Sequence, residues 1–411
     1  MSVSLDDIKT AAETISGEVI RTPLIHATRL SEMLDCELYL KLENHQHTGS
    51  FKDRGSLNKL KNLTPQQQER GVIAMSAGNH AQGVAYHATR LGIPSVIVMP
   101  EAAPFTKVER TRTLGARVVQ AGETIDEAAD TANQLMEEEG LTFVHPYDDP
   151  LIVAGQGTIG LEIFEDNPDI DAIVVPIGGG GICSGIATAA KALNADVEMF
   201  GVEAELYPSM FQTIHKLDPT SGGASIADGI AVKRPGKLTR QIIEALVSEI
   251  FLVDEGMLET AITNLVEYQK IVAEGAGAAG VAAIIKEFER FKGRKVATVI
   301  CGGNIDVRLL ASVLMRGLVR DGRLVRLRID ITDQPGVLAK VAGLIGRCGG
   351  NIVEVYHQRL FHDVPVKKAE VDAVIETRNR DHVMEIIDAL KDGGFQTRVL
   401  STLSSDGPTQ P

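Results

Sequence analysis

The sequence predicts an α/β protein in two parts: a large unit built on parallel strands and a smaller C-terminal unit with the element order βαββαβ. Short Val and Ile runs alternate with longer alanine-rich stretches through the first three quarters of the chain. The pattern changes at Arg316–Arg323, where glycines and charges replace it. We therefore place the large unit at 1–320, the small unit at 325–402 and a frayed tail at 403–411.

Seven aliphatic runs are the predicted strands of the large unit. Near-continuous Val and Ile in runs this short suit strands covered on both faces. The runs begin at Glu37, Val72, Ser95, Ala116, Ala172, Glu198 and Val296. Between them, Asn79–Leu91, Glu123–Glu139 and Gly181–Leu193 have the length and composition of crossover helices. Ligands of parallel sheets bind at the carboxyl ends of strands, so the residues after VIAMS, VVPI and TVI are the first site candidates.

The small unit is predicted from two apolar helix faces and four strand-like runs. Val337, Val341, Leu344 and Ile345 share one face, and Val383, Ile386, Ile387 and Leu390 share another. The elements are strand Val325–Ile331, helix Gly336–Arg347, strand Asn351–Leu360, strand Lys368–Thr377, helix Asp381–Lys391 and strand Gln396–Ser401. This is the order of a ferredoxin-like unit.

Composition and charge exclude several classes of protein. With 44% hydrophobic and 23% charged residues, the chain has the composition of a typical globular protein. The 41 basic and 55 acidic side chains give a formal charge of −14, so neither nucleic acid nor a membrane surface is expected as a partner. The four cysteines stand far apart without a CxxC pair, and the N-terminus lacks the pattern of a signal peptide. We expect reduced thiols and a cytoplasmic location.

Lys52 lies among small residues in GSFKDRGS, at the start of a predicted helix. Burial would favour its neutral amine and make it nucleophilic toward a carbonyl carbon. The octapeptide alone fits a surface lysine beside an N-cap serine equally well.

Two small-residue turns that lead into helices are candidate anion sites. Ser76, Ala77, Gly78, Asn79 and His80 follow the VIAMS strand, and the turn would expose backbone N–H groups to a carboxylate or phosphate. For His80 we prefer a buried, hydrogen-bonded role. The four glycines Gly178–Gly181 end the AIVVPI strand and suit a single phosphate. They lack the GxGxxG spacing and a Walker lysine, which disfavours a dinucleotide or a nucleoside triphosphate.

A third strand end carries CGGN, and Cys301 is either a small buried residue or a thiol facing a ring nitrogen. A reactive lysine, a phosphate turn and small-residue strand ends describe a pocket for a phosphorylated aldehyde. Pyridoxal phosphate fits this description.

The motifs SFKDRG, SAGNHAQG, GGGG, VAEGAGA and CGGN, in this order, resemble the fold-type II pyridoxal-phosphate family. Within it the chain is most similar to the threonine dehydratase (threonine ammonia-lyase) group and its serine dehydratase and serine racemase relatives. The resemblance covers about residues 5–315 and implies two open α/β subdomains of the tryptophan synthase β type. From Val325 onward the chain resembles ACT regulatory domains, with DQPGVLAKV as the matching turn.

The resemblance implies a role for each motif. Lys52 would hold the cofactor covalently and move the Cα proton of the substrate, and Asn79 would hydrogen-bond the ring hydroxyl of the cofactor. The turn at 76–80 would bind the substrate carboxylate. Gly178, Gly179, Gly180, Gly181 and Ile182 would bind the phosphate, and Cys301 would face the pyridine nitrogen. A neutral thiol there would not stabilise a protonated ring, which favours prompt elimination over long-lived carbanions.

Two positions depart from the relatives. Ala77 stands where serine racemase has a serine that acts as an acid and base, so we rank dehydration above racemisation. A racemase-like cation site would start at Glu203 and involve positions 207 and 209, but position 209 is a serine. Whether a metal binds there is left open, the alternative being a strand-end carboxylate paired with solvent or a base.

The expected reaction is conversion of L-threonine to 2-oxobutanoate and ammonia. A serine or 3-hydroxyaspartate dehydratase would use the same cofactor residues, and a non-catalytic amino-acid sensor is the alternative from a different class. The ACT resemblance implies an amino-acid effector, isoleucine or valine by analogy, at Asp333, Gln334, Pro335, Gly336, Val337 and Leu338. A purely oligomerising module is the alternative for that unit, and we expect a homodimer or homotetramer.

Overall fold

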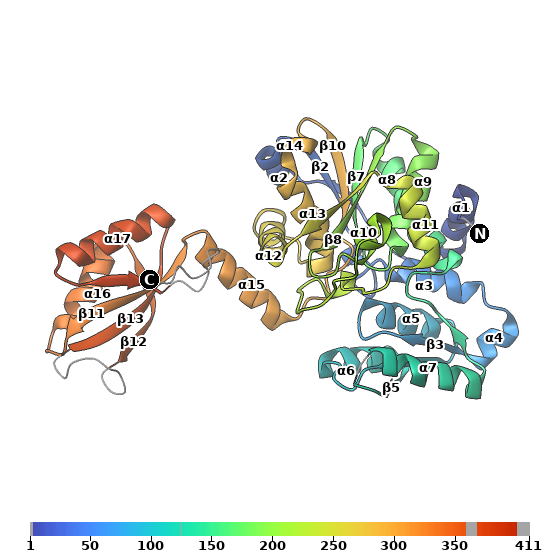
Figure 1. Cartoon of the computed structure of the whole chain (residues 1–411), viewed down its shortest axis with the longest axis horizontal. Helices are drawn as coiled ribbons and strands as arrows, with labels where there is room; N and C mark the ends of the chain where they lie inside the picture. Colours follow the sequence, from blue (N-terminus) through green and yellow to red (C-terminus); the bar gives the residue numbers. More distant parts are fainter. Residues whose placement is uncertain (1–2, 124, 359–367, 401–411) are drawn as a thin grey trace. The chain divides into compact units, whose positions relative to one another are not determined.

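The computed structural model describes residues 3–123, 125–358 and 368–400. The chain divides into a first unit, Met1–Asp306, and a second unit, Val307–Pro411 (Figure 1). The segment Arg316–Arg323, where the sequence pattern changes, falls on the end of helix α15 (Val307–Arg320) and the turn that follows it. The predicted tail at 403–411 lies outside the described residues, as do the last two residues of the strand expected to end at Leu360.

A six-stranded sheet forms the larger half of the first unit, with the order β1-β2-β10-β7-β8-β9. Its neighbours are parallel except β1 and β2. The strands are β1 (Leu24–His26), β2 (Glu37–Lys41), β7 (Ala172–Pro176), β8 (Glu198–Ala204), β9 (Glu249–Val253) and β10 (Lys295–Val299). All of β7 is buried, which explains its unbroken aliphatic run.

Helices cover both faces of this sheet. Figure 1 shows α8 and α9 on one side and α13 on the other. The helices of this half are α1 (Leu5–Ile15), α2 (Thr28–Leu34), α3 (Lys52–Lys61), α8 (Pro150–Asp166), α9 (Gly181–Leu193), α10 (Ser209–His215), α11 (Lys237–Leu246), α12 (Glu255–Asn264), α13 (Gly275–Lys286) and α14 (Phe288–Phe291). Single turns add η1 (Glu43–His45), η2 (Asp228–Ile230) and η3 (Leu265–Gln269).

Glycines inside α3, α8 and α9 let these three helices touch backbone to backbone. A Cβ on Gly155 of α8 would lie 2.7 Å from the Cα of Gly55 in α3. A Cβ on Gly185 of α9 would lie 2.4 Å from the carbonyl oxygen of Val153 in α8. Glycine is costly inside a helix, and here close packing is its physical reason.

A second, four-stranded parallel sheet in the first unit has the order β5-β4-β3-β6. Val72 and Ala74 belong to one apolar cluster and Ile73 to another, so alternate side chains of β3 enter different cores, one on α5 and one on α7. The elements are α4 (Pro65–Arg70), β3 (Val72–Met75), α5 (Asn79–Arg90), β4 (Ser95–Met99), α6 (Phe105–Thr113), β5 (Arg117–Gln120), α7 (Ile125–Glu139) and β6 (Thr142–Phe143). The two sheets confirm the predicted α/β class.

The second unit contains an antiparallel sheet of order β12-β13-β11-β14. Its elements after α15 are β11 (Leu324–Thr332), α16 (Val337–Arg347), β12 (Asn351–Gln358), β13 (Lys368–Glu376), α17 (Arg380–Asp392) and β14 (Thr397–Val399). Val341, Ile345, Ile386 and Leu390 pack on the buried face of this sheet. The element order matches the predicted βαββαβ, while the ACT assignment stays a prediction. No helix within the described residues is long and apolar enough to cross a membrane.

Candidate active site

Lys52 is the first residue of α3 and is tied to the end of β10. Ser50 forms a bridge with Gly302, and the Phe51 N–H donates to the Cys301 carbonyl oxygen at 3.1 Å. The Lys52 Nζ donates to the carbonyl oxygen of Pro146 at 2.6 Å. The GSFKDRGS and CGGN motifs, about 250 residues apart in sequence, are therefore adjacent in space.

Burial controls the charge of the amine and the thiol at this place. Desolvation lowers the pKa of Lys52 to about 8, although Cys301 and Glu274 oppose the change. Desolvation and the nearby Glu274 raise the pKa of the Cys301 thiol above its usual value. The result is an amine that readily becomes neutral beside a thiol that stays protonated.

The four-glycine turn leads from β7 into α9, and its close contacts require glycine. Gly180 has φ +97°. A Cβ on Gly179 would lie 2.2 Å from the ring of Tyr147. Thr239 fixes the turn by donating from Oγ1 to the Gly179 carbonyl oxygen at 2.6 Å. No side chain caps the start of α9, so the N–H groups of its first turn remain suited to an anion.

The Pro146–Tyr147 segment brings Lys52 and the glycine turn together. Its first residue accepts the hydrogen bond of the lysine, and its second lies against Gly179 and Gly181. Both ends of the expected ligand site therefore contact the same dipeptide. Nothing in the sequence of this loop indicated it.

The turn at 76–80 joins β3 to α5. Residues 76–79 are partly exposed, and the Cβ position of Gly78 faces open space. The Gly78 N–H donates to Ser76 Oγ at 3.1 Å, and no side chain caps α5. These features leave room for a carboxylate at the helix start.

His80 is buried with its Nε2 at 2.8 Å from the Val144 carbonyl oxygen, as the preferred interpretation had it. Desolvation, followed by the charge of Lys52, lowers the pKa of His80 to about 3, so its ring is neutral. Its side chain therefore brings no positive charge to the turn.

Asn79 begins α5 and makes two side-chain hydrogen bonds to the other half of the unit. Its Nδ2 donates to Glu274 Oε1 at 2.6 Å, and its Oδ1 accepts from Asn304 Nδ2 at 2.8 Å. Desolvation raises the pKa of Glu274 to about 7. Glu274 and Asn304 lie in the VAEGAGA and CGGN motifs, but sequence reasoning gave neither a role. Their positions next to glycines in these two motifs were the feature of the sequence that could have indicated a role.

A buried ion network lies beneath the start of α3. The Arg54 guanidinium binds Glu43 through Nε at 2.8 Å and Nη2 at 2.7 Å, and Glu162 at 2.7 and 2.8 Å. Lys41 contacts Glu162 at 2.6 Å. Arg54, Glu43 and Lys41 have fully buried side chains. Burial raises the pKa of Glu162, but its cationic partners outweigh this and lower it overall.

Glu203 caps a helix. It is fully buried and accepts the backbone N–H groups of Met210 and Phe211, each at 2.8 Å, at the start of α10. The suggestion that it pairs with solvent or a base was therefore wrong. Position 207 belongs to Tyr207, and no cluster of three metal-ligating His, Cys, Asp or Glu side chains occurs in the part of the chain that the structure describes.

Four of the predicted regulatory residues, 333–336, join β11 to α16 in the second unit, and Val337 and Leu338 begin α16. All six are exposed except Val337, which packs against the core of that unit. Gly336 precedes α16 with φ +86°, a backbone conformation that favours glycine.

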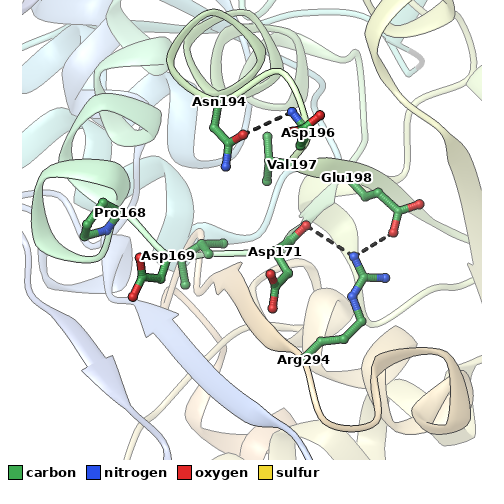
Figure 2. A pocket seen from close by; sticks show the side chains of 9 residues that line it. Pro168, Asp169, Asp171, Asn194, Asp196, Val197, Glu198 and Arg294 are labelled. Atoms are coloured by element: carbon green, nitrogen blue, oxygen red, sulfur yellow. Dashed lines mark hydrogen bonds and ion pairs between the residues drawn. The ribbon is translucent and has the colours of Figure 1, made fainter.

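A surface pocket of about 590 Å³ lies away from all these residues. It is lined by residues at the amino ends of β7, β8 and β10 (Figure 2). Arg294 closes one side by contacting Glu198 at 2.6 Å and the Asp171 carbonyl oxygen at 3.2 Å. Sheets of this kind bind ligands at the opposite, carboxyl ends, so we place the site at Lys52.

The residues around Lys52 fit pyridoxal phosphate on their own chemistry. Lys52 is an amine for its aldehyde, and the uncapped start of α9 with its glycines suits its phosphate. Asn79 has an amide for its hydroxyl, and Cys301 is a protonated thiol for its ring nitrogen.

The comparisons with known proteins agree with this chemistry. The family model described as pyridoxal-phosphate dependent enzyme matches residues 15–302. An L-threonine ammonia-lyase from Thermotoga maritima is 45% identical over 400 residues, which cover 97% of this chain and 100% of that protein. Maize serine racemase is 32% identical with a TM-score of 0.73, covering 78% of this chain and 99% of that chain. The processed form of threonine deaminase isoform 2 from Solanum lycopersicum is 34% identical with a TM-score of 0.71, covering 77% and 90%. The chain belongs to the family of pyridoxal-phosphate dependent enzymes.

Proposed function

We propose that this enzyme is a threonine ammonia-lyase that converts L-threonine to 2-oxobutanoate and ammonia. The observation that carries the proposal is the readily neutralised Lys52 amine, set against a glycine turn through Pro146 and Tyr147. The Thermotoga maritima L-threonine ammonia-lyase, aligned over 97% of this chain, supports the choice of substrate.

Each site residue has one task in the proposed reaction. Bound pyridoxal phosphate supplies a conjugated electron sink beside the Cα of the substrate. Lys52 removes the Cα proton, for which its pKa of about 8 gives a useful neutral fraction near neutral pH. The backbone N–H groups of the 76–80 turn bind the substrate carboxylate. Gly178–Gly181 and Ile182 hold the phosphate.

The polarity of the remaining groups favours elimination. Cys301 keeps its proton and offers no negative charge to the ring nitrogen. Ala77 packs against the apolar core of the four-stranded half and carries no group that could donate a proton to the substrate. Racemisation needs a second proton-transfer group on the opposite face, so we rank it below dehydration despite the likeness to maize serine racemase.

The second unit carries the proposed control of this activity. We propose that the 333–338 segment, exposed except at Val337, binds an amino-acid effector, with isoleucine or valine the first candidates. The position of this segment, from the end of β11 into the first turn of α16, supports a ligand role. A homodimer or homotetramer and a cytoplasmic location complete the proposal.

The substrate test is release of 2-oxo acid from L-threonine, L-serine and 3-hydroxyaspartate. We expect the highest kcat/KM for L-threonine. Lys52→Ala should abolish both turnover and the visible absorption of the lysine-bound cofactor. Lys61→Ala, at the other end of α3, is the matched control and should retain both. Full turnover by Lys52→Ala would refute the assignment, and a higher kcat/KM for L-serine would refute the choice of substrate.

The effector test uses the full-length enzyme with isoleucine and valine added separately. We expect a change in KM or kcat with at least one of them, and loss of this response in Leu338→Asp. Kinetics that neither amino acid alters would leave the second unit as an oligomerising module.

A further inference from the structure

A directional chain of hydrogen bonds runs through the Asn79 side chain. Arg110 of α6 donates from Nη1 to Asn304 Oδ1 at 3.0 Å, and Asn304 Nδ2 donates to the Thr48 carbonyl oxygen at 2.7 Å and to Asn79 Oδ1 at 2.8 Å. Asn79 Nδ2 then donates to Glu274 Oε1 at 2.6 Å. The chain crosses between the two halves of the first unit three times, because Arg110 and Asn79 belong to the four-stranded half, whereas Asn304 and Glu274 belong to the other.

The chemistry of the end groups fixes every amide in this chain. A guanidinium can only donate and a backbone carbonyl can only accept, so Asn304 must place its oxygen toward Arg110 and its nitrogen toward Thr48. Asn79 must then place its oxygen toward Asn304 and its nitrogen toward Glu274. A flipped Asn79 would set two nitrogens against each other at one side and two oxygens at the other.

The surrounding glycines leave room for this arrangement. A Cβ on Gly302 would lie 2.3 Å from Glu274 Oε1, and a Cβ on Gly49 would lie 2.9 Å from Asn304 Oδ1. Gly49 also has φ +75°, which disfavours other residues. A side chain at Gly302 or Gly49 would therefore displace Glu274 or Asn304, so the hydrogen bonds of these two residues depend on glycine at both positions.

We propose that Glu274 and Asn304 are positioning residues that hold the Asn79 amide in one orientation, with an N–H of Nδ2 directed at the ring hydroxyl oxygen of the cofactor. This inference rests on the proposed function, which assigns Asn79 to that hydroxyl. Nδ2 carries two hydrogens, of which Glu274 takes one. The other serves the cofactor. Glu274 acts here as a hydrogen-bond acceptor and not through its charge.

The test is titration of the cofactor-free protein with pyridoxal phosphate, followed by visible absorption, with no substrate present. Asn79→Ala should raise the dissociation constant about five- to tenfold, as expected for one lost hydrogen bond. Glu274→Ala should raise it similarly, whereas Glu274→Gln keeps an acceptor oxygen and should remain within about twofold of the wild type. Asn304→Asp, which replaces a donor with an acceptor, should be at least as harmful as Asn304→Ala.

A double variant shows whether Glu274 acts through Asn79 or contributes to cofactor binding separately. In the Asn79→Ala background, Glu274→Ala should change the dissociation constant by less than about twofold. Glu203→Gln, at a buried carboxylate that caps α10, is the matched control and should leave it unchanged. Thermal unfolding of each cofactor-free variant identifies any that fail to fold, and Glu274→Gln and Asn304→Asp then carry the test.

Each outcome decides a different point. If Asn79→Ala binds the cofactor as the wild type does, the role of Asn79 in the proposed function fails. If Asn79→Ala weakens binding and Glu274→Ala does not, only the positioning inference fails. Equal losses in Glu274→Gln and Glu274→Ala, or an undiminished effect of Glu274→Ala in the Asn79→Ala background, would also overturn it.

Discussion

Arg54→Met removes the centre of the buried network beneath α3. The side chains of Arg54 and Glu43 have no exposed surface, and Glu162 is 13% exposed. Without the guanidinium, Glu43 keeps its hydrogen bonds from Thr22 and Gln46, and Glu162 keeps its ion pair with Lys41. Removing one partner of a buried ion pair costs roughly 3–5 kcal/mol, because the other charge is left buried and unpaired. We expect a loss near the middle of that range.

Scanning calorimetry of the cofactor-free protein measures this loss in the transition of the first unit. One kcal/mol lowers Tm by roughly 2–4 °C for 150–250 residues, so the longer first unit should melt on the order of 8 °C lower. Glu43→Gln removes the unpaired charge and should recover part of the loss in the double variant. A decrease in stability below about 1 kcal/mol, or a double variant no more stable than Arg54→Met, would contradict the reasoning.

Three further predictions concern the site and its surroundings. Gly179→Ala places a Cβ 2.2 Å from the Tyr147 ring and should destabilise the first unit by roughly 1–3 kcal/mol and weaken pyridoxal phosphate binding, as measured by calorimetry and titration. Between pH 8 and 10.5 the unfolded chain holds a proton on Lys52 that the folded protein lacks, so stability should rise with pH there; Lys52→Met should remove this rise in urea unfolding of the cofactor-free protein. Burial raises the pKa of Glu203 from 4.5 to about 7, so between these pH values folded Glu203 holds a proton that the unfolded chain has lost. Its contribution to stability should therefore fall as pH rises, and Glu203→Gln should flatten that fall in thermal unfolding.

The regular elements were the most predictable part of the fold. Gly181–Leu193 is a helix with the predicted bounds, and Ser95–Met99 is a fully buried strand. Both elements follow from periodicity and composition, and the residues of the segment itself contain all of this information. β1 and β6, with three and two residues, gave no such pattern, and pairing with longer neighbours holds them.

The site was predictable where it depends on residue types at strand ends. Cys301 follows a parallel strand, where the rule for such sheets placed a site candidate, and Lys52 at the start of α3 lies beside it. The sequence did not predict the roles of Pro146 and Arg110 or the hydrogen bonds that join Asn304, Asn79 and Glu274. These contacts depend on how the two halves of the unit meet. Arg54 resembled any charged residue in a helix, and only the fold shows that two distant carboxylates enclose it.

The glycine contacts between α3, α8 and α9 set a fixed spacing in this enzyme. Lys52 begins α3 and Gly181 begins α9, and α8 joins these helices through Gly55–Gly155 and Val153–Gly185 contacts. Contacts between main chains cannot be relieved by changing a rotamer, so the separation of the two helix starts is fixed. In the proposed function this separation sets the distance between the lysine and the phosphate site of the cofactor. A single methyl group added at Gly155 or Gly185 would therefore change the separation of the two helix starts, although it would touch no group of the proposed ligand site.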